Sequence, residues 1–282
     1  MMLEECLRQA EAQLRSGPHP GRARQDAETL LLRVLGRNRA FLLAHSNDLL
    51  DGERAAAYLA LIQRRLAGEP IQYITGEAEF YGLPFRVTPA VLIPRPETEH
   101  LVEKVLELAA SFSAPRIVDV GTGSGAIAIA LAAHLPAGSI TATDISAGAL
   151  SIARQNAERN GVAARIRLAE GDLLAPLAGE QFQIVASNPP YVSTADSSSL
   201  AVEVRDHEPA QALFAGINGL DVYRRLIPAA RAALVSGGFL ALEIGHGQAP
   251  EVGALLTASG FAGVAFTPDL QGIPRVATAR RP

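Results

Sequence analysis

A donor-poor segment stands at residues 187–191, which read Ser-Asn-Pro-Pro-Tyr and follow the apolar run FQIVA without a gap. Neither Pro189 nor Pro190 has a backbone N–H, so the backbone offers only carbonyl acceptors at these two positions. Asn188 adds a side-chain carbonyl, and Tyr191 adds a flat ring. Acceptors beside a ring suit a planar –NH2 group, because they bind its two N–H donors while the ring packs against its plane. These four residues are therefore predicted to bind an amino group and to form the catalytic centre.

An –NH2 group of this kind occurs in adenine, in cytosine and in a glutamine side chain, and it is a poor nucleophile because its lone pair is delocalised. Holding both protons orients the nitrogen. It also stabilises the positive charge that grows as the nitrogen attacks a methyl group in line with a departing sulfur. This chemistry requires neither a metal ion nor a covalent nucleophile. A Pro-Pro turn that only ends a strand is the structural alternative.

The sequence IVDVGTGSGA at residues 117–126 is the strongest local signal for a ligand. A buried strand is expected to run into Gly121, Gly123 and Gly125 and then into an apolar helix. The glycines allow a tight turn and a close approach of the ligand, and the helix N-terminus supplies free N–H groups. Asp144 ends the next strand, where a carboxylate can accept hydrogen bonds from both hydroxyls of a ribose. The loop suits a dinucleotide or S-adenosylmethionine, and a tight turn without a ligand is the remaining alternative.

Two further carboxylates refine this prediction. Asp119 precedes the glycines, where it would repel a pyrophosphate and would either receive a cationic ligand or orient the loop, so the adenosyl sulfonium is preferred. Asp172 ends the third strand, where an adenine ring would lie, and a solvated turn is an equal alternative for it. The predicted cofactor-binding residues are Asp119, Gly121, Thr122, Gly123, Ser124, Gly125, Asp144, Ile145, Asp172, Leu173 and Asn188.

Strands and helices that alternate from residue 116 onward are expected to position these motifs. The predicted strands are 116–120, 139–143, 165–170, 182–187, 237–244, 261–267 and 273–280, and the predicted helices are 97–112, 125–134, 146–160 and 220–234. Such alternation is typical of a doubly wound α/β sheet with helices on both faces, in which ligands bind at the carboxyl ends of the strands.

The first part of the chain is predicted to be a small helical bundle, because apolar residues recur at helical spacing within about 3–14, 27–35, 39–45 and 55–66. Residues 73–87 are rich in aromatic and β-branched residues and are predicted to form a hairpin. The predicted domains are an N-terminal helical domain (1–75), a hairpin and linker (76–96) and a Rossmann-like α/β domain (97–282).

The composition limits the possible partners. The 282 residues carry a net charge of −4, so no broad basic surface for nucleic acid is expected. Cys6 is the only cysteine, which excludes an intramolecular disulfide and a cysteine-rich zinc site and suits a reducing compartment. The first residues are acidic and amphipathic, unlike a signal peptide, and the apolar stretch 126–133 is too short to span a membrane. We expect a cytoplasmic protein that binds neither a metal nor a membrane.

With these motifs the chain resembles the amino-group methyltransferases, and further motifs narrow the resemblance to the bacterial peptide chain release factor glutamine methyltransferases. These motifs are Gly68–Ile74 (GEPIQYI), Val91–Glu99 (VLIPRPETE), Glu203–Pro209 (EVRDHEP), Gly219–Asp221 (GLD) and Leu242–Gly245 (LEIG). The resemblance covers nearly the whole chain. It implies a class I methyltransferase fold and the transfer of a methyl group from S-adenosylmethionine to a glutamine side-chain amide nitrogen. The glutamine is that of the Gly-Gly-Gln motif in class I release factors.

The resemblance also implies roles for individual residues. Gly121–Gly125 and Asp144 would bind the cofactor, together with the segment Asp172-Leu173, and Asn188–Tyr191 would hold the glutamine amide. The N-terminal helical domain would help to dock the release factor. Three residues of the linker motif would border the active site and contact the substrate: Arg95, Glu97 and Thr98.

Three alternatives remain open. His207 stands where Tyr or Phe is common before Glu-Pro, and a sister family that methylates a glutamine of a large-subunit ribosomal protein can carry His there; its typical Ser-Pro replacement within RPETE is absent here. A DNA or RNA adenine methyltransferase would need a basic groove and aromatic residues for a flipped base. A nucleotide-binding module without methyl transfer would leave Asn-Pro-Pro-Tyr unexplained. Glu243, inside an apolar strand, is predicted to be structural and to anchor a backbone amide or Arg95.

Overall fold

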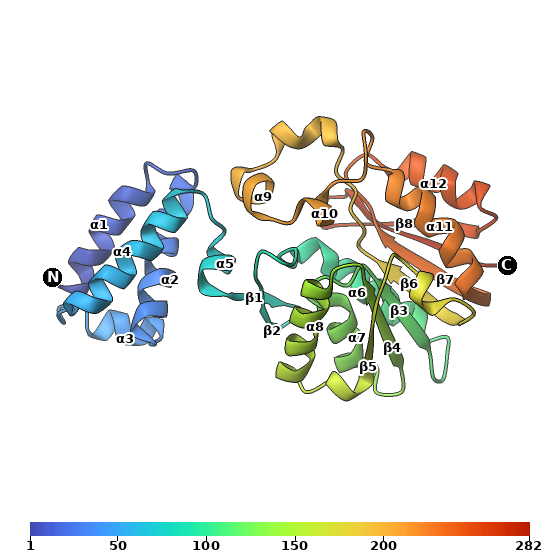
Figure 1. Ribbon diagram of the computed structural model, residues 1–282, viewed down its shortest axis with the longest axis horizontal. Coiled ribbons are helices and arrows are strands. Elements are labelled where there is room, and N and C mark those ends of the chain that lie inside the picture. The colour runs from blue at the N-terminus through green and yellow to red at the C-terminus, as the bar shows by residue number, and fades with distance from the viewer. The chain divides into compact units, whose positions relative to one another are not determined.

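The computed structural model describes all residues from Met1 to Pro282, and the chain divides into two compact units (Figure 1). The helical unit comprises Met1–Gly76 together with Leu200–His207, and the sheet unit comprises Glu77–Ser199 together with Glu208–Pro282. The sequence pattern assigns Leu200–His207 to the α/β domain, whereas in the structure this segment makes its contacts within the helical unit. No helix in the chain is both long enough and apolar enough to cross a membrane.

Amphipathic helices build the helical unit. They are α1 (Leu3–Leu14), α2 (Ala23–Leu35), α3 (Arg39–Ala44), α4 (Gly52–Leu66), α5 (Ile71–Thr75) and α9 (Val202–His207), with a 3-10 turn at Pro20–Arg22. Leu7, Leu30 and Ile62 are buried at the centre of their shared core. The Tyr58 hydroxyl donates to the Ala27 carbonyl at 3.0 Å, which joins α4 to α2. The predicted helical bundle is therefore confirmed.

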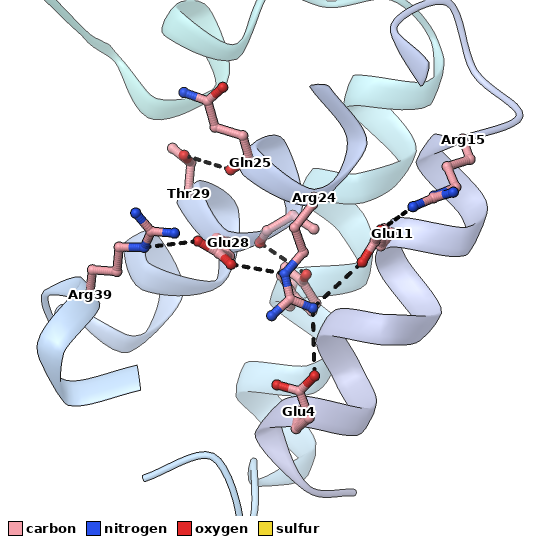
Figure 2. A network of polar contacts seen from close by, with 10 residues as sticks. Glu4, Glu11, Arg15, Arg24, Gln25, Glu28, Thr29 and Arg39 are labelled. Carbon is pink, nitrogen blue, oxygen red and sulfur yellow. Dashed lines mark hydrogen bonds and ion pairs between the residues drawn. The ribbon is translucent and has the colours of Figure 1, made fainter. Parts of the chain in front are cut away.

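Charged side chains tie the helices of this unit together at its surface. Figure 2 shows Arg24 of α2 between Glu11 and Glu4 of α1 and Glu28 of its own helix. The nitrogen–oxygen distances are 3.5 Å to Glu11, 3.6 Å to Glu4 and 2.8 Å to Glu28. Glu28 also pairs with Arg39 of α3 at 3.3 Å. Because several charges share this network, it orients α1, α2 and α3 more effectively than an isolated exposed pair would.

A second network in the helical unit is buried. The Arg65 side chain of α4 is only 2% exposed and donates to Asp26 of α2 at 2.7 Å. Arg65 also donates to Glu203 of α9 at 3.0 Å and to the Glu69 carbonyl at 2.9 Å. Burying an arginine is costly unless the charge is paired, so this network requires α9 to stay in place.

The predicted hairpin is shorter than the sequence suggests. Ile71–Thr75 forms the helical turn α5, which ends at Gly76 in the left-handed conformation with φ 77°. The strands are β1 (Glu77–Phe80) and β2 (Leu83–Arg86), joined by Tyr81 and Gly82, which both have positive φ. The prediction failed at residues 73–75 because burial of Ile71, Tyr73 and Ile74 and the glycine C-cap outweigh their strand propensity.

A mixed sheet with seven strands forms the second unit. The strands are β3 (Arg116–Val120), β4 (Ser139–Asp144), β5 (Ile166–Glu170), β6 (Phe182–Ser187), β7 (Leu234–Glu243), β8 (Ala262–Pro268) and β9 (Pro274–Arg280). Their order across the sheet is β5-β4-β3-β6-β7-β9-β8. All are parallel except β9, which runs antiparallel to β7 and β8. All seven predicted strands are present, and the chain order reverses between β3 and β6.

Helices cover both faces of this sheet. The longer ones are α6 (Glu99–Ala109), α7 (Ala126–His134), α8 (Ala147–Arg159), α11 (Asp221–Ala233) and α12 (Ala249–Ala258), and α10 spans Ala210–Leu213. Short 3-10 turns lie at Pro96–Thr98, Ala163–Arg165, Ala175–Leu177 and Thr194–Ser199. Along β6, Ile184 belongs to the hydrophobic cluster that contains residues of α6, α7 and α8, whereas Val185 belongs to the cluster that contains residues of α11 and α12. The sequence analysis missed α12, because Pro250 and Gly253 weaken its helical pattern; the proline is tolerated in the first turn.

Candidate active site

A cavity of about 580 Å³ opens at the carboxyl ends of β3, β4, β5 and β6, beside the reversal of strand order. This is where open α/β sheets bind ligands, and the volume suits a small-molecule site. It brings together most of the predicted site residues: Arg95, Thr98, Gly121, Thr122, Gly123, Ser124, Asp144, Ile145, Asp172, Leu173, Asn188 and Pro190. The predicted residues that do not line it are Glu97, Asp119, Gly125, Pro189 and Tyr191.

Asp144 fastens the glycine loop to the neighbouring strand. Its Oδ2 accepts a hydrogen bond of 2.8 Å from the Gly123 N–H, and its Oδ1 accepts one of 2.9 Å from the Ser146 N–H. A carboxylate has about four acceptor positions, so two remain for a ligand. At Gly121 and Gly123 an added Cβ would meet no protein atom within 4 Å, and both residues have positive φ. The loop is therefore open toward the cavity and needs glycine for its backbone conformation.

Asp119 lies behind the loop and orients it. Its Oδ2 accepts hydrogen bonds from the Thr122 hydroxyl at 2.6 Å and from the Ala128 N–H in α7 at 3.2 Å. Its Oδ1 is buried and has no hydrogen-bond partner. Burial raises the pKa of Asp119 to about 7, against the opposing effect of these two donors, and the nearby Asp144 raises it further. Of its two predicted roles, the geometry favours orienting the loop over contacting a ligand.

Asn156 is a site residue that the sequence analysis missed. It is fully buried on the inner side of α8, and its Nδ2 donates to the Ser124 carbonyl at 2.9 Å and to the Arg86 carbonyl at 3.0 Å. The Arg86 N–H donates back to its Oδ1. Asn156 thus joins the hairpin to the glycine loop. The available signal was a polar residue at a position where the helical spacing Ala149–Ile152–Ala153 predicts an apolar one.

The side chain of Asn188 is oriented by the linker before α6. Its Nδ2 donates to the Thr98 hydroxyl oxygen at 3.0 Å, and its Oδ1 accepts no hydrogen bond from the protein. Asn188 and Pro190 line the cavity, and Thr98 lines it too although it is only 4% exposed. The free acceptor of Asn188 is therefore available to a ligand, next to two residues that cannot donate from their backbone.

A buried carboxyl stands behind this arrangement. Glu243 at the end of β7 is 2% exposed; its Oε1 accepts from the Tyr191 hydroxyl at 3.4 Å, and its Oε2 has no hydrogen-bond partner. Burial raises the pKa of Glu243 to about 7, while the hydroxyls of Thr98 and Tyr191 act to lower it. Burial likewise raises the pKa of Tyr191. The predicted link from Glu243 to Arg95 is wrong, because Arg95 points to a different carboxylate.

That carboxylate is Glu208. Arg95 donates to its Oε1, and the Ile93 N–H donates to its Oε2 at 3.4 Å. The Glu208 side chain is 1% exposed, whereas Arg95 is 30% exposed and reaches the cavity. This pair fastens the segment that begins at Glu208 to the linker. Glu97, which was grouped with Arg95 and Thr98 as substrate-binding, is exposed and lies outside the cavity lining.

Two residues farther along the chain, Gln248 and Gly219, lie against the backbone carbonyl of Tyr191. Gln248 donates from Nε2 to the Tyr191 carbonyl at 3.0 Å and accepts from the Gly245 N–H at 3.0 Å. Gly219 has positive φ, and a Cβ there would lie 2.2 Å from the same carbonyl oxygen. The Gly-Leu-Asp motif therefore has a steric reason for its glycine. Gln248 carries no local sequence signal, and His246 beside it is exposed and lies outside the cavity lining.

The far end of the cavity carries the remaining predicted residues. Ile145 and Leu173 present apolar surface, and Asp172 pairs with Arg225 of α11. Arg225 also lines the cavity and was not predicted. An apolar pair beside a charged one can accept a flat ring with polar edges.

Two protein families match this chain, one mainly in the helical unit and one mainly in the sheet unit. Residues 5–76 match the PrmC N-terminal domain family, and residues 97–216 match the methyltransferase small domain family. The chain is 45% identical to the release factor glutamine methyltransferase of Moorella thermoacetica, over all of this chain and 99% of that one. It is also 45% identical to the proteins of the same name in Deinococcus radiodurans (100% and 99% covered) and Geobacter sulfurreducens (92% and 89% covered).

Solved structures support the fold. A methyltransferase from Pyrococcus furiosus aligns with a TM-score of 0.51 at 18% identity, over 71% of this chain and 90% of that one. A 16S rRNA methyltransferase of T. thermophilus, in complex with AdoMet and guanosine, aligns with a TM-score of 0.55 at 19% identity, over 73% and 50%. At these identities the likeness concerns the fold, and it confirms the predicted class I methyltransferase sheet.

Proposed function

Because this chain belongs to the release factor glutamine methyltransferases, we propose that it methylates the side-chain amide nitrogen of the glutamine in the Gly-Gly-Gln motif of a class I release factor. The methyl donor is S-adenosylmethionine. One observation carries the proposal. The unpartnered Oδ1 of Asn188 and the donor-free Pro189-Pro190 backbone stand at the edge of a cavity that the glycine loop also lines.

The Asn-Pro-Pro-Tyr residues bind and orient the glutamine amide in this proposal. Asn188 Oδ1 accepts one N–H of the amide, and a backbone carbonyl of the Asn-Pro-Pro run accepts the other. These two acceptors fix the direction of the nitrogen and stabilise the positive charge that develops on it during the transfer. Gln248 holds the backbone carbonyl of Tyr191, the last residue of this motif, whose ring lies outside the cavity lining.

The residues of the glycine loop fit the proposed methyl donor, which supplies a methyl group activated by a sulfonium sulfur. Asp144 has acceptor positions left for the two hydroxyls of a ribose, and the space beyond Gly121 and Gly123 is free of protein atoms. Ile145 and Leu173 would flank the adenine. Asp119 keeps the loop in shape through Thr122 and Ala128.

We assign the docking of the release factor to the helical unit. Leu43 and Leu49 are 76% and 77% exposed in this unit, and exposed leucines of this kind suit contact with a protein partner. The proposed location is the cytoplasm, because Cys6 is free and buried and the substrate acts on ribosomes. Replacing Leu43 and Leu49 together by Ser should raise the KM for the release factor and leave the affinity for S-adenosylmethionine unchanged. An unchanged KM would remove this surface from the proposal.

The enzyme is tested with methyl-labelled S-adenosylmethionine and three purified acceptors: a class I release factor, a large-subunit ribosomal protein and an oligonucleotide. Label on the release factor glutamine, located by peptide mass spectrometry, is expected. Label only on the ribosomal protein or only on the oligonucleotide would overturn the proposal.

An Asn188→Ala variant separates the two binding roles. It should lower kcat on the order of 100-fold, as the loss of one preorganised polar contact does, while calorimetry shows little change in S-adenosylmethionine affinity. A collapse of cofactor binding in this variant would show that Asn188 belongs to the cofactor site instead.

A further inference from the structure

The aromatic ring that the sequence analysis expected beside the substrate amide is held elsewhere in the structure. Pro190 lines the active-site cavity, whereas Tyr191 lines a separate cavity of about 430 Å³. The Tyr191 hydroxyl donates to Glu243 Oε1 at 3.4 Å. A Cβ added at Gly245 would lie 3.0 Å from Cδ2 of the Tyr191 ring. The ring is therefore held against the end of β7, and the active-site cavity must obtain a flat surface from another residue.

Phe214 is the only aromatic residue that lines the active-site cavity. It follows the short helix α10 and has an extended backbone conformation, with φ −92° and ψ 133°. Successive side chains of an extended segment point to opposite sides. Accordingly Ala215 is buried in the protein, while Phe214 is half-buried and borders the cavity. Part of the Phe214 ring is thus available to a ligand.

Backbone hydrogen bonds fix Phe214 beside the Asn-Pro-Pro-Tyr motif. Phe214 pairs with Val192 in a parallel bridge. The Val192 N–H donates to the Leu213 carbonyl at 2.8 Å, and the Ala215 N–H donates to the Val192 carbonyl at 2.9 Å. Because Val192 directly follows the motif, these bonds hold the backbone of Phe214 at a fixed spacing from it.

The ring belongs to the same side of the cavity as the amide acceptors. The residues predicted to bind the cofactor come mostly from the ends of β3, β4 and β5, whereas Asn188 and Pro190 follow β6 and Phe214 is paired with the continuation of that segment. A planar amide needs polar partners at its edge and an apolar surface against its plane. Asn188 supplies a free acceptor for the edge, and Phe214 supplies a flat apolar surface in the same cavity.

We propose that Phe214 is a substrate-binding residue whose ring packs against the side chain of the target glutamine, in the role that the sequence analysis expected of Tyr191. The proposal rests on the proposed function. The ring contacts the methylene groups and the plane of the amide, and it leaves the two N–H groups to Asn188 and the Pro-Pro carbonyls. Since a phenyl ring neither donates nor accepts strongly, it limits the tilt of the amide without competing for these hydrogen bonds.

Substitutions of Phe214 test the contact. Phe214→Ala should lower kcat/KM for the release factor about tenfold, the size expected when an apolar contact with a substrate is lost. Its affinity for S-adenosylmethionine, measured by calorimetry, should stay unchanged, which also shows that the variant is folded. Phe214→Leu keeps apolar volume without a flat face and should lie between the two, whereas Phe214→Tyr keeps the ring and should restore kcat/KM. A wild-type kcat/KM in Phe214→Ala would overturn the proposal.

A fluorine signal reports on the same position without turnover. The chain contains no tryptophan, so Phe214→Trp labelled with fluorotryptophan gives one fluorine NMR signal. In the complex with S-adenosylhomocysteine, which carries no methyl group to transfer, this signal should shift when the release factor is added. It should not shift with a release factor whose motif glutamine is replaced by alanine. No shift with the first protein, or equal shifts with both, would overturn the contact.

Leu270→Trp is the matched control for this measurement. Leu270 is 98% exposed and lies between β8 and β9, away from the cavity lining. Its fluorine signal should be the same with both release factor proteins. A difference between them at this position would show that the probe does not report on the glutamine, and the interpretation of the Phe214→Trp signal would fall with it.

These measurements separate the role of Phe214 from the proposed function. Label on the release factor glutamine together with a wild-type kcat/KM in Phe214→Ala would keep the function and refute the contact. Label only on the ribosomal protein would refute the proposed substrate. A tenfold loss of kcat/KM for that protein in Phe214→Ala would then keep the contact with a glutamine side chain, and an unchanged kcat/KM would refute it as well. Label only on the oligonucleotide would refute both.

Discussion

The Asn188 side chain donates from Nδ2 to the hydroxyl of Thr98 at 3.0 Å, although the two residues are 90 positions apart in the chain. Thr98 belongs to the linker before α6, and Asn188 follows β6 in the middle of the sheet. The contact leaves Oδ1 as the only free end of the amide. The linker motif and the Asn-Pro-Pro-Tyr motif are therefore parts of one site, and the identity of the residue at position 98 bears on the chemistry at position 188.

Gly219→Ala should impair the enzyme through the backbone of Tyr191. The new Cβ would lie 2.2 Å from the Tyr191 carbonyl oxygen, and the residue has φ +70°, so the segment that we propose to bind the glutamine must shift. We expect a clear loss of kcat with a smaller effect on S-adenosylmethionine affinity. Gly272→Ala is the matched control, because its φ is +81° but nothing lies within 4 Å. Equal activity losses in the two variants would contradict the steric explanation.

Gln248→Ala should lower both stability and activity. The Gly245 N–H and the Tyr191 carbonyl would each lose a partner, and an unsatisfied buried group costs about 1–3 kcal/mol. Urea unfolding measures the first effect and methyl transfer the second. Gln248→Glu keeps the acceptor for Gly245 but turns an oxygen toward the Tyr191 carbonyl. If that variant were as active as wild type, the donor of Gln248 would have no role.

Asp119 should make the wild-type protein less stable as pH rises. Its folded pKa of about 7 lies above its ordinary value of 3.8, so its contribution is fully present below about pH 4 and is lost as pH rises through 7. Asp119→Asn can keep both donors, from Thr122 and Ala128, without this loss. The stability of the variant relative to wild type should therefore increase between pH 5 and 8, by up to about 1.4 kcal/mol per pH unit. Urea unfolding at both pH values measures the difference in unfolding free energy between the variant and wild type. The same difference at both pH values would contradict the raised pKa of Asp119.

Arg65→Met should destabilise the helical unit strongly. It leaves Asp26, whose side chain is 3% exposed, without its buried partner, and breaking such a pair costs about 3–5 kcal/mol. Arg24→Met is the control in the same unit, because its network in Figure 2 is at the surface and exposed pairs contribute about 0–1 kcal/mol. Thermal unfolding of the full chain compares the two variants. Similar losses of stability would mean that burial of Arg65 does not matter.

The sequence alone predicts the seven strands, the helices of the sheet unit except α10 and α12, and the two motifs at the sheet edge. These are local properties. Gly121, Gly123 and Asp144 follow strands directly, and parallel strands bring their carboxyl ends to one edge whatever the rest of the chain does. Asn188 also directly follows a strand, and the lack of backbone N–H donors at Pro189 and Pro190 is evident from the sequence without knowledge of any distant residue.

Only the tertiary structure decides which distant side chains support these motifs. Thr98 and Asn188, Gln248 and Tyr191, and Asn156 and the hairpin are joined across the sheet unit, and Glu203 reaches Arg65 over 138 positions. A hydroxyl, an amide or a carboxyl has the same local pattern whether it faces solvent or a buried partner. Its role depends on which groups lie within hydrogen-bond distance of it. The spatial arrangement of the strands and helices determines which groups these are.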